Sequence, residues 1–149
     1  MAQSLSKLLV HVTFSTKGRH PFLEDKNLRQ ELYNYMSALF GKMDSLAIVI
    51  RGVADHLHIL FVLNRNRTLS EVMRSIKASS SGWLKRKGVD GFAWQNGYAA
   101  FSVGESTIQS VKNYIENQVE HHKKFDFRNE LRELLKRHNV EFDERYIWD

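Results

Sequence analysis

Two histidines, His56 and His58, stand inside an apolar segment and offer the most specific chemistry in the sequence. Because side chains alternate along a β-strand, both imidazoles project to one face, whereas Leu57, Ile59 and Phe61 project to the other. Two imidazoles on one face can bind a single divalent metal ion. The pair alone is equally consistent with two partly exposed histidines on a half-buried strand.

A tyrosine and a glutamine in the second half of the chain form another candidate group. Tyr114 and Gln118 are four residues apart in a segment predicted to be helical, so they share one face of that helix. A phenol has a pKa of about 10 and is a poor nucleophile at neutral pH. It can still attack a phosphodiester when a metal ion withdraws charge from the phosphate. The alternative is a tyrosine at the rim of the core beside a solvated amide.

These four side chains can be combined into one hypothetical site. His56, His58 and the amide oxygen of Gln118 would form an uncharged ligand set for Mg²⁺ or Mn²⁺, with coordination positions left open for phosphate oxygens. Tyr114, one helical turn before Gln118, would then lie beside the same phosphate. The spacing therefore favours metal-assisted attack on a phosphodiester.

The hydrophobic pattern predicts the elements that must position these residues. Strands are expected at residues 8–14, 45–51, 56–63 and 92–103. Helices are expected at residues 24–42, 68–88, 105–123 and 128–138. The second of these helices opens with Thr68 and Glu71, which have the spacing of a capping box.

The order strand, helix, strand, strand, helix, strand, helix predicts an α+β fold of the ferredoxin-like, split βαβ type. Its sheet would be antiparallel and covered by helices on one face, with an extra C-terminal helix that carries Tyr114. The second face, if uncovered, would be available for a ligand or a second subunit. The 149 residues are expected to form a single domain, residues 1–149.

The composition excludes several classes of protein. The sequence contains no cysteine, which removes disulfides, thiolate zinc sites and cysteine nucleophiles. No stretch approaches the roughly 18–20 uninterrupted apolar residues of a membrane span. The first residues also lack the basic-then-apolar plan of a secretory signal. We therefore expect a cytoplasmic protein.

The formal net charge of +5 favours a polyanionic partner such as nucleic acid. Basic residues follow the histidine strand, line the next predicted helix and end a later one: Arg65, Arg67, Lys77, Lys85, Arg86, Lys87, Lys123 and Lys124. Any one of them could simply belong to the solvated face of a helix. Their clustering near the histidine strand is what indicates nucleic acid.

Taken together, these motifs resemble those of the single-tyrosine HUH transposases, which mobilise small insertion sequences as single-stranded DNA. The resemblance rests on the sequence His56-Leu57-His58 and on Tyr114-Ile115 followed by Gln118. Further matching segments are residues 94–98 (WQNGY), 100–103 (AFSV), 117–122 (NQVEHH) and 143–149 (DERYIWD). The resemblance extends from about residue 8 to the end of the sequence.

The resemblance implies a role for each residue of the hypothetical site. His56, His58 and Gln118 would bind Mg²⁺ or Mn²⁺, and Tyr114 would attack the scissile phosphate. The attack would form a 5′-phosphotyrosine link and free a 3′-hydroxyl, which later reseals a strand without a nucleotide cofactor. His121 and His122 follow Gln118 by three and four residues and could approach the metal, but such residues more often cap or fringe a helix, so they are not assigned as ligands.

The resemblance also implies partners. Family members are homodimers in which the tyrosine helix of one subunit completes the metal site of the other, and they bind single-stranded DNA hairpins near the ends of the element. This would be a bacterial or archaeal protein that associates with the nucleoid when bound to DNA. Two alternatives remain: a host-retained hairpin-binding protein without transposition activity, and an unrelated ferredoxin-like binding module.

Overall fold

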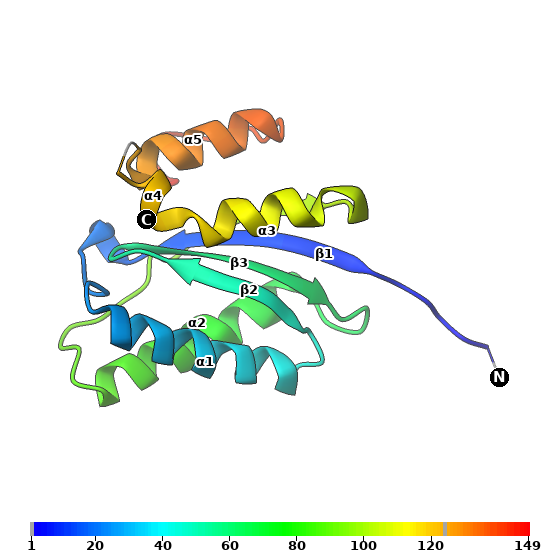
Figure 1. The fold of residues 1–149 in the computed structure, drawn as a ribbon, viewed down its shortest axis with the longest axis horizontal. Helices are drawn as coiled ribbons and strands as arrows, with labels where there is room; N and C mark the ends of the chain where they lie inside the picture. Colours follow the sequence, from blue (N-terminus) through cyan, green and yellow to red (C-terminus); the bar gives the residue numbers. More distant parts are fainter. Residues whose placement is uncertain (1, 124) are drawn as a thin grey trace.

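A four-stranded sheet with helices on both faces forms the centre of the molecule (Figure 1). The computed structural model describes residues 2–123 and 125–149, so Met1 and the basic residue Lys124 lie outside the described residues. The strands are β1 (Leu8–Ser15), β2 (Ala47–Gly52), β3 (His56–Leu63) and β4 (Ala99–Val103). The helices are α1 (Lys26–Lys42), α2 (Leu69–Arg86), α3 (Ile108–Glu116), α4 (Gln118–His121) and α5 (Phe127–Arg137), with short 3₁₀ turns η1 (Lys17–Arg19) and η2 (Glu105–Thr107).

The order of the strands in the sheet is β2-β3-β1-β4, and each neighbouring pair is antiparallel. Strand β1 lies between β3 and β4, and its register places Thr13 opposite His58 and His11 opposite Leu60. This arrangement confirms the predicted α+β, ferredoxin-like fold with an antiparallel sheet. An extra helix after the last strand, α3, carries Tyr114 as predicted.

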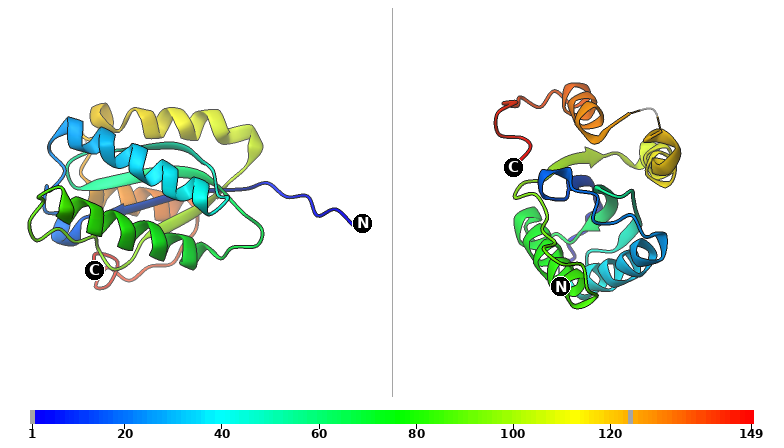
Figure 2. Two further views of the ribbon diagram at one scale, coloured as in Figure 1. Left: turned by 90° about the horizontal axis from the view of Figure 1, so that it is seen from below. Right: turned by 90° about the vertical axis from the view of Figure 1, so that its left-hand side faces the viewer.

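Helices α1 and α2 lie side by side on the first face of the sheet (Figure 2). Asp25 caps α1 by accepting hydrogen bonds from the backbone amides of Asn27 and Leu28. Thr68 and Glu71 form the predicted capping box at the start of α2. Between these helices and the sheet lies the main apolar core, to which β3 contributes Leu57, Ile59 and Phe61.

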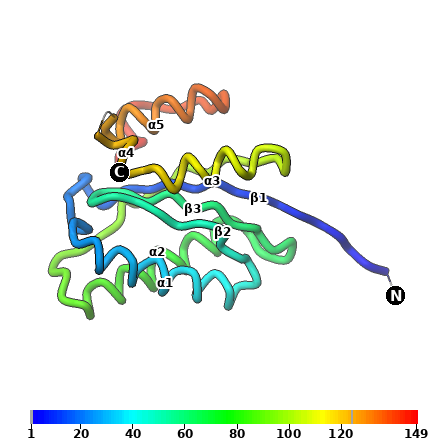
Figure 3. The backbone as a smooth tube through the Cα atoms, in the orientation of Figure 1, coloured from blue at the N-terminus to red at the C-terminus, as the bar shows by residue number. Residues whose placement is uncertain are grey.

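The second face of the sheet is covered as well, by α3 and α5 (Figure 3). The expectation of helices on one face alone was therefore wrong. Helix α3 buries Ile115 against Leu60 and Val49, because its apolar stripe faces the sheet. Helix α5 packs through a second apolar cluster formed by Phe101, Phe127, Leu131, Leu134 and Leu135.

Two predicted elements are shorter in the structure than in the sequence pattern. The strand expected at residues 92–103 is reduced to β4, preceded by one isolated bridge between Trp94 and Thr16. The backbone between them is held by Lys77, whose Nζ donates to the carbonyl oxygens of Gln95, Asn96 and Gly97 at 2.6, 3.1 and 2.8 Å. A side chain from α2 therefore satisfies carbonyls that a strand neighbour would otherwise satisfy.

The helix expected at residues 105–123 is divided into η2, α3 and α4. The break falls at Asn117, whose backbone angles are φ −97° and ψ 21°. Asparagine is a poor residue for a helix interior because its side chain competes for backbone hydrogen bonds. Within the described residues, no helix is long and apolar enough to cross a membrane.

Candidate active site

The histidine pair lies on β3, on the face of the sheet turned toward α3 and α5. Both side chains are fully buried, at 0 % exposure, so the alternative of two partly exposed histidines is wrong. Their ring centroids are 5.3 Å apart. The intervening Leu57 is buried in the main core on the opposite face, as strand alternation predicts.

Four side chains converge beside this pair: those of His56, His58, His122 and Glu130. One ligand atom from each lies within 4.8 Å of the others. Glu130 Oε1 is 2.8 Å from His58 Nε2, 3.1 Å from His122 Nε2 and 3.3 Å from His56 Nε2. The His56 and His122 Nε2 atoms are 2.9 Å apart. Three imidazoles thus surround one carboxylate oxygen.

Contacts at the other ring nitrogens orient the two β3 imidazoles. His56 Nδ1 is 2.7 Å from Asp55 Oδ1, and His58 Nδ1 is 2.9 Å from His11 Nε2. Burial, with the neighbouring His58, lowers the pKa of His11 to about 3, so His11 stays neutral at physiological pH. Such supporting contacts fix the ring orientation of metal-binding histidines in proteins.

The charge state of the cluster follows from its burial and its hydrogen bonds. Burial raises the pKa of Glu130, but His58 and hydrogen bonds from His122 and His56 outweigh this, so the pKa of the carboxyl falls well below its usual value. Burial lowers the pKa of His56, yet hydrogen bonds to Asp55 and Glu130 bring it above the usual value. Glu130 is therefore an ionised carboxylate among imidazoles.

Tyr114 reaches the same carboxylate from α3. Its hydroxyl donates a hydrogen bond to Glu130 Oε2, and its ring centroid is 5.6 Å from that of His58. Burial and the charge of Glu130 raise the pKa of Tyr114 far above its usual value, so this state holds a phenol and not a phenolate. Tyr114 borders two pockets of about 400 and 160 Å³, and Arg137 of α5 borders both.

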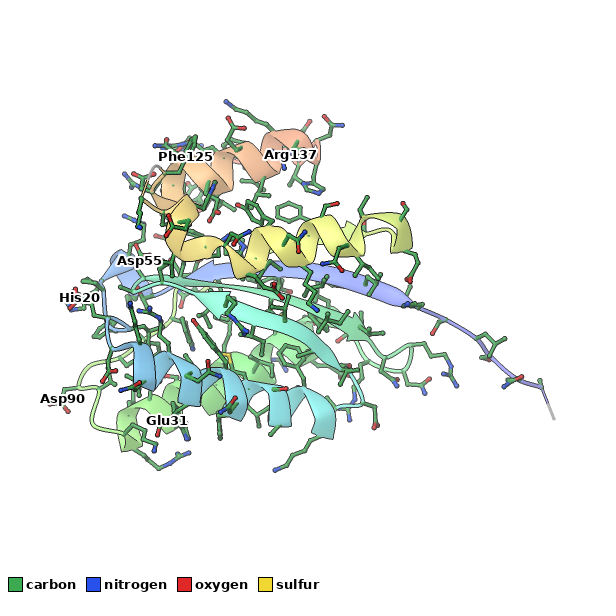
Figure 4. The ribbon with its side chains drawn as sticks, viewed as in Figure 1. His20, Glu31, Asp55, Asp90, Phe125 and Arg137 are labelled. Atoms are coloured by element: carbon green, nitrogen blue, oxygen red, sulfur yellow. The ribbon has the colours of Figure 1, made fainter. Side chains whose placement is uncertain are left out.

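Figure 4 shows Arg137 and Phe125 toward the two ends of the α5 region, which lies above α3. The side chain of Phe125 is stacked on His121, with ring planes 12° apart. Between these two residues, α5 turns Glu130 inward, where only 2 % of it is exposed. Helix α5 is therefore the element that closes the site over β3.

Gln118, the predicted third ligand, lies at the start of α4 with only 1 % of its surface exposed. Its Nε2 donates to the Tyr114 carbonyl oxygen at 3.3 Å. Its Oε1 is buried and has no hydrogen-bond partner among the described residues. Buried polar atoms are usually hydrogen-bonded, so an unpaired amide oxygen beside Tyr114 is a candidate ligand atom.

Sequence reasoning missed Glu130 and placed His122 at the fringe of a helix, whereas the structure brings both into the site. His121 also approaches, with its Nε2 3.2 Å from Glu130 Oε2. One sequence signal points to Glu130: it interrupts the apolar stripe of α5, between Phe127 and Leu134. A glutamate on the buried side of an amphipathic helix is rarely left there without a partner.

The residues present fit a divalent metal ion. Imidazole nitrogens and a carboxylate oxygen are common protein ligands for such ions, and their burial here provides a rigid, dry setting. The unpaired Oε1 of Gln118, a residue hydrogen-bonded to the backbone of Tyr114, is a further oxygen donor. The groups around the histidine pair are therefore of the kind that could hold a metal ion, next to a tyrosine hydroxyl.

Comparison with known proteins identifies the family. Residues 4–118 match the family of IS200-like transposases, and because the match spans most of the chain, the protein belongs to that family. The resemblance drawn from the sequence motifs is thereby confirmed. Membership makes the protein a transposase, that is, a DNA-processing enzyme. No curated protein is similar enough in sequence to serve as a relative.

Solved structures share the fold. A structure described as a transposase from Deinococcus radiodurans R1 superposes with a TM-score of 0.63 at 21 % identity, covering 79 % of this chain and 98 % of the other. A REP-associated tyrosine transposase bound to a REP hairpin gives a TM-score of 0.59 at 16 % identity, covering 81 % of this chain and 74 % of the other. At these identities, the similarity establishes the fold.

Proposed function

We propose that this protein cleaves and rejoins single-stranded DNA at the hairpin-flanked ends of a mobile element, through a 5′-phosphotyrosine intermediate on Tyr114. The observation that carries the proposal is that Tyr114 and the histidine pair share one partner. The Tyr114 hydroxyl donates to one oxygen of Glu130, and the other oxygen lies between His56 and His58. A nucleophile and a set of metal donors therefore meet at one carboxylate.

We assign His56, His58 and Gln118 as ligands of Mg²⁺ or Mn²⁺. The buried imidazoles and the unpaired Gln118 oxygen support this assignment. A divalent ion held there would supply Lewis-acid chemistry by withdrawing charge from the scissile phosphate. His11 and Asp55 keep the two imidazoles in fixed orientations, so little reorganisation is needed when a ligand binds.

The reaction itself conserves the phosphodiester bond. The Tyr114 oxygen forms a new bond to phosphorus, the bond from phosphorus to the 3′-oxygen breaks, and the departing strand ends in a 3′-hydroxyl. Before attack the Tyr114 hydroxyl donates its proton to a hydrogen bond with Glu130 Oε2. Attack releases this proton, and the departing 3′-oxygen takes up one proton, so the step neither gains nor loses protons overall. Attack by a 3′-hydroxyl on the same phosphorus reverses these steps, releases Tyr114 and reseals the strand without a nucleotide cofactor.

The proposed substrate is a single strand that carries a hairpin. The net charge of +5 suits contact with phosphates, and Arg65 and Arg67, after β3, are exposed. A REP-associated tyrosine transposase that shares this fold is bound to a REP hairpin in its structure. Because the proposed substrate is DNA, we propose a cytoplasmic protein of a bacterium or archaeon that associates with the nucleoid when it is bound to DNA.

We propose a homodimer as the working assembly, and propose that each subunit uses its own tyrosine. This differs from the exchange of helices that the family resemblance implies. A single chain already holds Tyr114 beside its own His58. Mixing Tyr114→Phe protein with His58→Ala protein tests the point: the mixture should stay inactive, and a restored DNA adduct would mean that subunits exchange their tyrosine helices.

The central test is a denaturing gel with labelled single-stranded hairpin DNA from the flanks of the gene itself. With Mn²⁺ or Mg²⁺, the wild-type protein should give a slowly migrating covalent adduct, which EDTA and Tyr114→Phe abolish. Tyr146→Phe is the matched control, because Tyr146 is 64 % exposed in the C-terminal tail. Binding of the hairpin without any adduct would instead favour the host-retained binding protein, whereas the third alternative, an unrelated binding module, is already ruled out by the family match.

A further inference from the structure

The side chain of Glu130 contacts both halves of the site. Its Oε1 faces the Nε2 atoms of His56, His58 and His122 at 2.8–3.3 Å. Its Oε2 accepts the Tyr114 hydroxyl. No other described side chain is hydrogen-bonded to both the histidine pair and Tyr114. Glu130 thus links two elements that lie far apart in the sequence, β3 and α3.

The position of Glu130 is costly for a purely structural residue. It lies on the buried side of α5, beside the apolar residues Phe127, Leu131 and Leu134. A buried carboxylate loses its hydration, and well-packed apolar side chains often stabilise a fold at least as well as a buried ion pair. An apolar residue at position 130 would therefore pack α5 against its neighbours at least as well as Glu130 does. The negative charge of Glu130 must have a role other than packing.

We propose that Glu130 joins the metal centre to the nucleophile: with His122, its Oε1 adds to the donors already assigned on His56, His58 and Gln118, and its Oε2 holds the Tyr114 hydroxyl beside them. The second role rests on the proposed function of Tyr114. The donor set is rich in imidazole nitrogen, whereas Mg²⁺ prefers an all-oxygen environment. The site should therefore bind Mn²⁺ more tightly than Mg²⁺.

The metal half of the proposal is tested without DNA, by isothermal titration calorimetry of metal-free protein. Glu130→Gln keeps the shape of the side chain and removes its charge, and should weaken Mn²⁺ binding roughly 10- to 100-fold. Glu141→Gln, a change at an exposed glutamate outside α5, should leave the affinity unchanged. A Glu130→Gln protein that is folded by circular dichroism and binds Mn²⁺ like the wild type would overturn the assignment.

If Glu130→Gln fails to fold, the metal donors can still be tested on the wild-type protein. Wild-type protein titrated separately with Mn²⁺ and Mg²⁺ should bind Mn²⁺ at least about 10-fold more tightly, as expected for nitrogen-rich ligands. Equal affinity for the two ions would contradict a donor set that includes the imidazoles of His56, His58 and His122.

The nucleophile half is tested with DNA at saturating Mn²⁺. Glu130→Gln should bind the hairpin with wild-type affinity but form the Tyr114 adduct at least about 10-fold more slowly, because a misplaced nucleophile lowers the rate and not the binding. An unchanged rate would overturn this half. If the wild-type protein forms no adduct, the proposed function fails. The Mn²⁺ titrations then still test whether Glu130 is a metal donor.

Discussion

The two faces of the sheet are both buried at β3 but differ in chemistry. On the first face, β3 packs Leu57, Ile59 and Phe61 against α1 and α2 in a continuous apolar core. On the second face, the same strand presents His56 and His58 to Glu130 and its neighbours. Because side chains alternate along β3, this one strand contributes both to the apolar core and to the candidate active site.

The difference shows how a reactive site can be kept rigid. On the second face the two β3 imidazoles are held by polar neighbours, with His11 bonded to His58 and Asp55 to His56. Their backbone is held by the packing on the opposite face. We therefore expect changes on the first face to alter stability, and changes on the second to alter chemistry.

The largest effects should come from a matched pair of substitutions on β3. Phe61→Ala removes a fully buried ring that packs on Phe40 and should lower the free energy of unfolding by about 3–5 kcal/mol. The fraction that remains folded should still form the DNA adduct. His58→Ala should abolish adduct formation.

Urea unfolding and the denaturing gel measure the two effects separately. The comparison between the faces would break down if Phe61→Ala, measured per folded molecule, lost its activity. It would also break down if His58→Ala remained fully active, because the buried imidazole would then be part of the packing alone.

The next largest effect should be the increase in the free energy of unfolding when Mn²⁺ binds to the residues on the second face. At a free Mn²⁺ concentration 100 times its Kd, binding to the native state alone adds about 2.7 kcal/mol. His56→Ala should eliminate this gain in the free energy of unfolding. Phe61→Ala should retain the gain, although the metal-free variant is itself less stable than the wild type. Melting curves with Mn²⁺ and with EDTA measure it, and a gain that survives in His56→Ala would place the ion elsewhere.

The local features of the fold could be read from the sequence. The predicted limits of the histidine strand, residues 56–63, coincide with β3, and the capping box of Thr68 and Glu71 is formed. Both depend on residues close together in the chain. The order of the elements was enough to predict the antiparallel, ferredoxin-like sheet.

The completed site could not be read in the same way, because its contacts are distant in sequence. His58 and Glu130 are 72 positions apart, and the leucine stripe of α5 indicates a buried side without saying which surface it meets. The pattern therefore located His56, His58, Tyr114 and Gln118 as candidates, but not the carboxylate between them.

The smallest effect should come from the helix cap on the first face. In Thr68→Ala the hydroxyl that accepts from the Glu71 backbone amide is lost, and the first turn of α2 keeps an unsatisfied donor. Loss of such a cap typically costs about 1 kcal/mol. Thr68→Ser retains the hydroxyl and should recover most of that stability in urea unfolding.

Because Thr68 lies on the far side of the sheet from Glu130, Mn²⁺ affinity should be unchanged in both variants. A Thr68→Ala protein with altered Mn²⁺ affinity would show that the packing on the first face tunes the metal donors, and that the two faces are not independent.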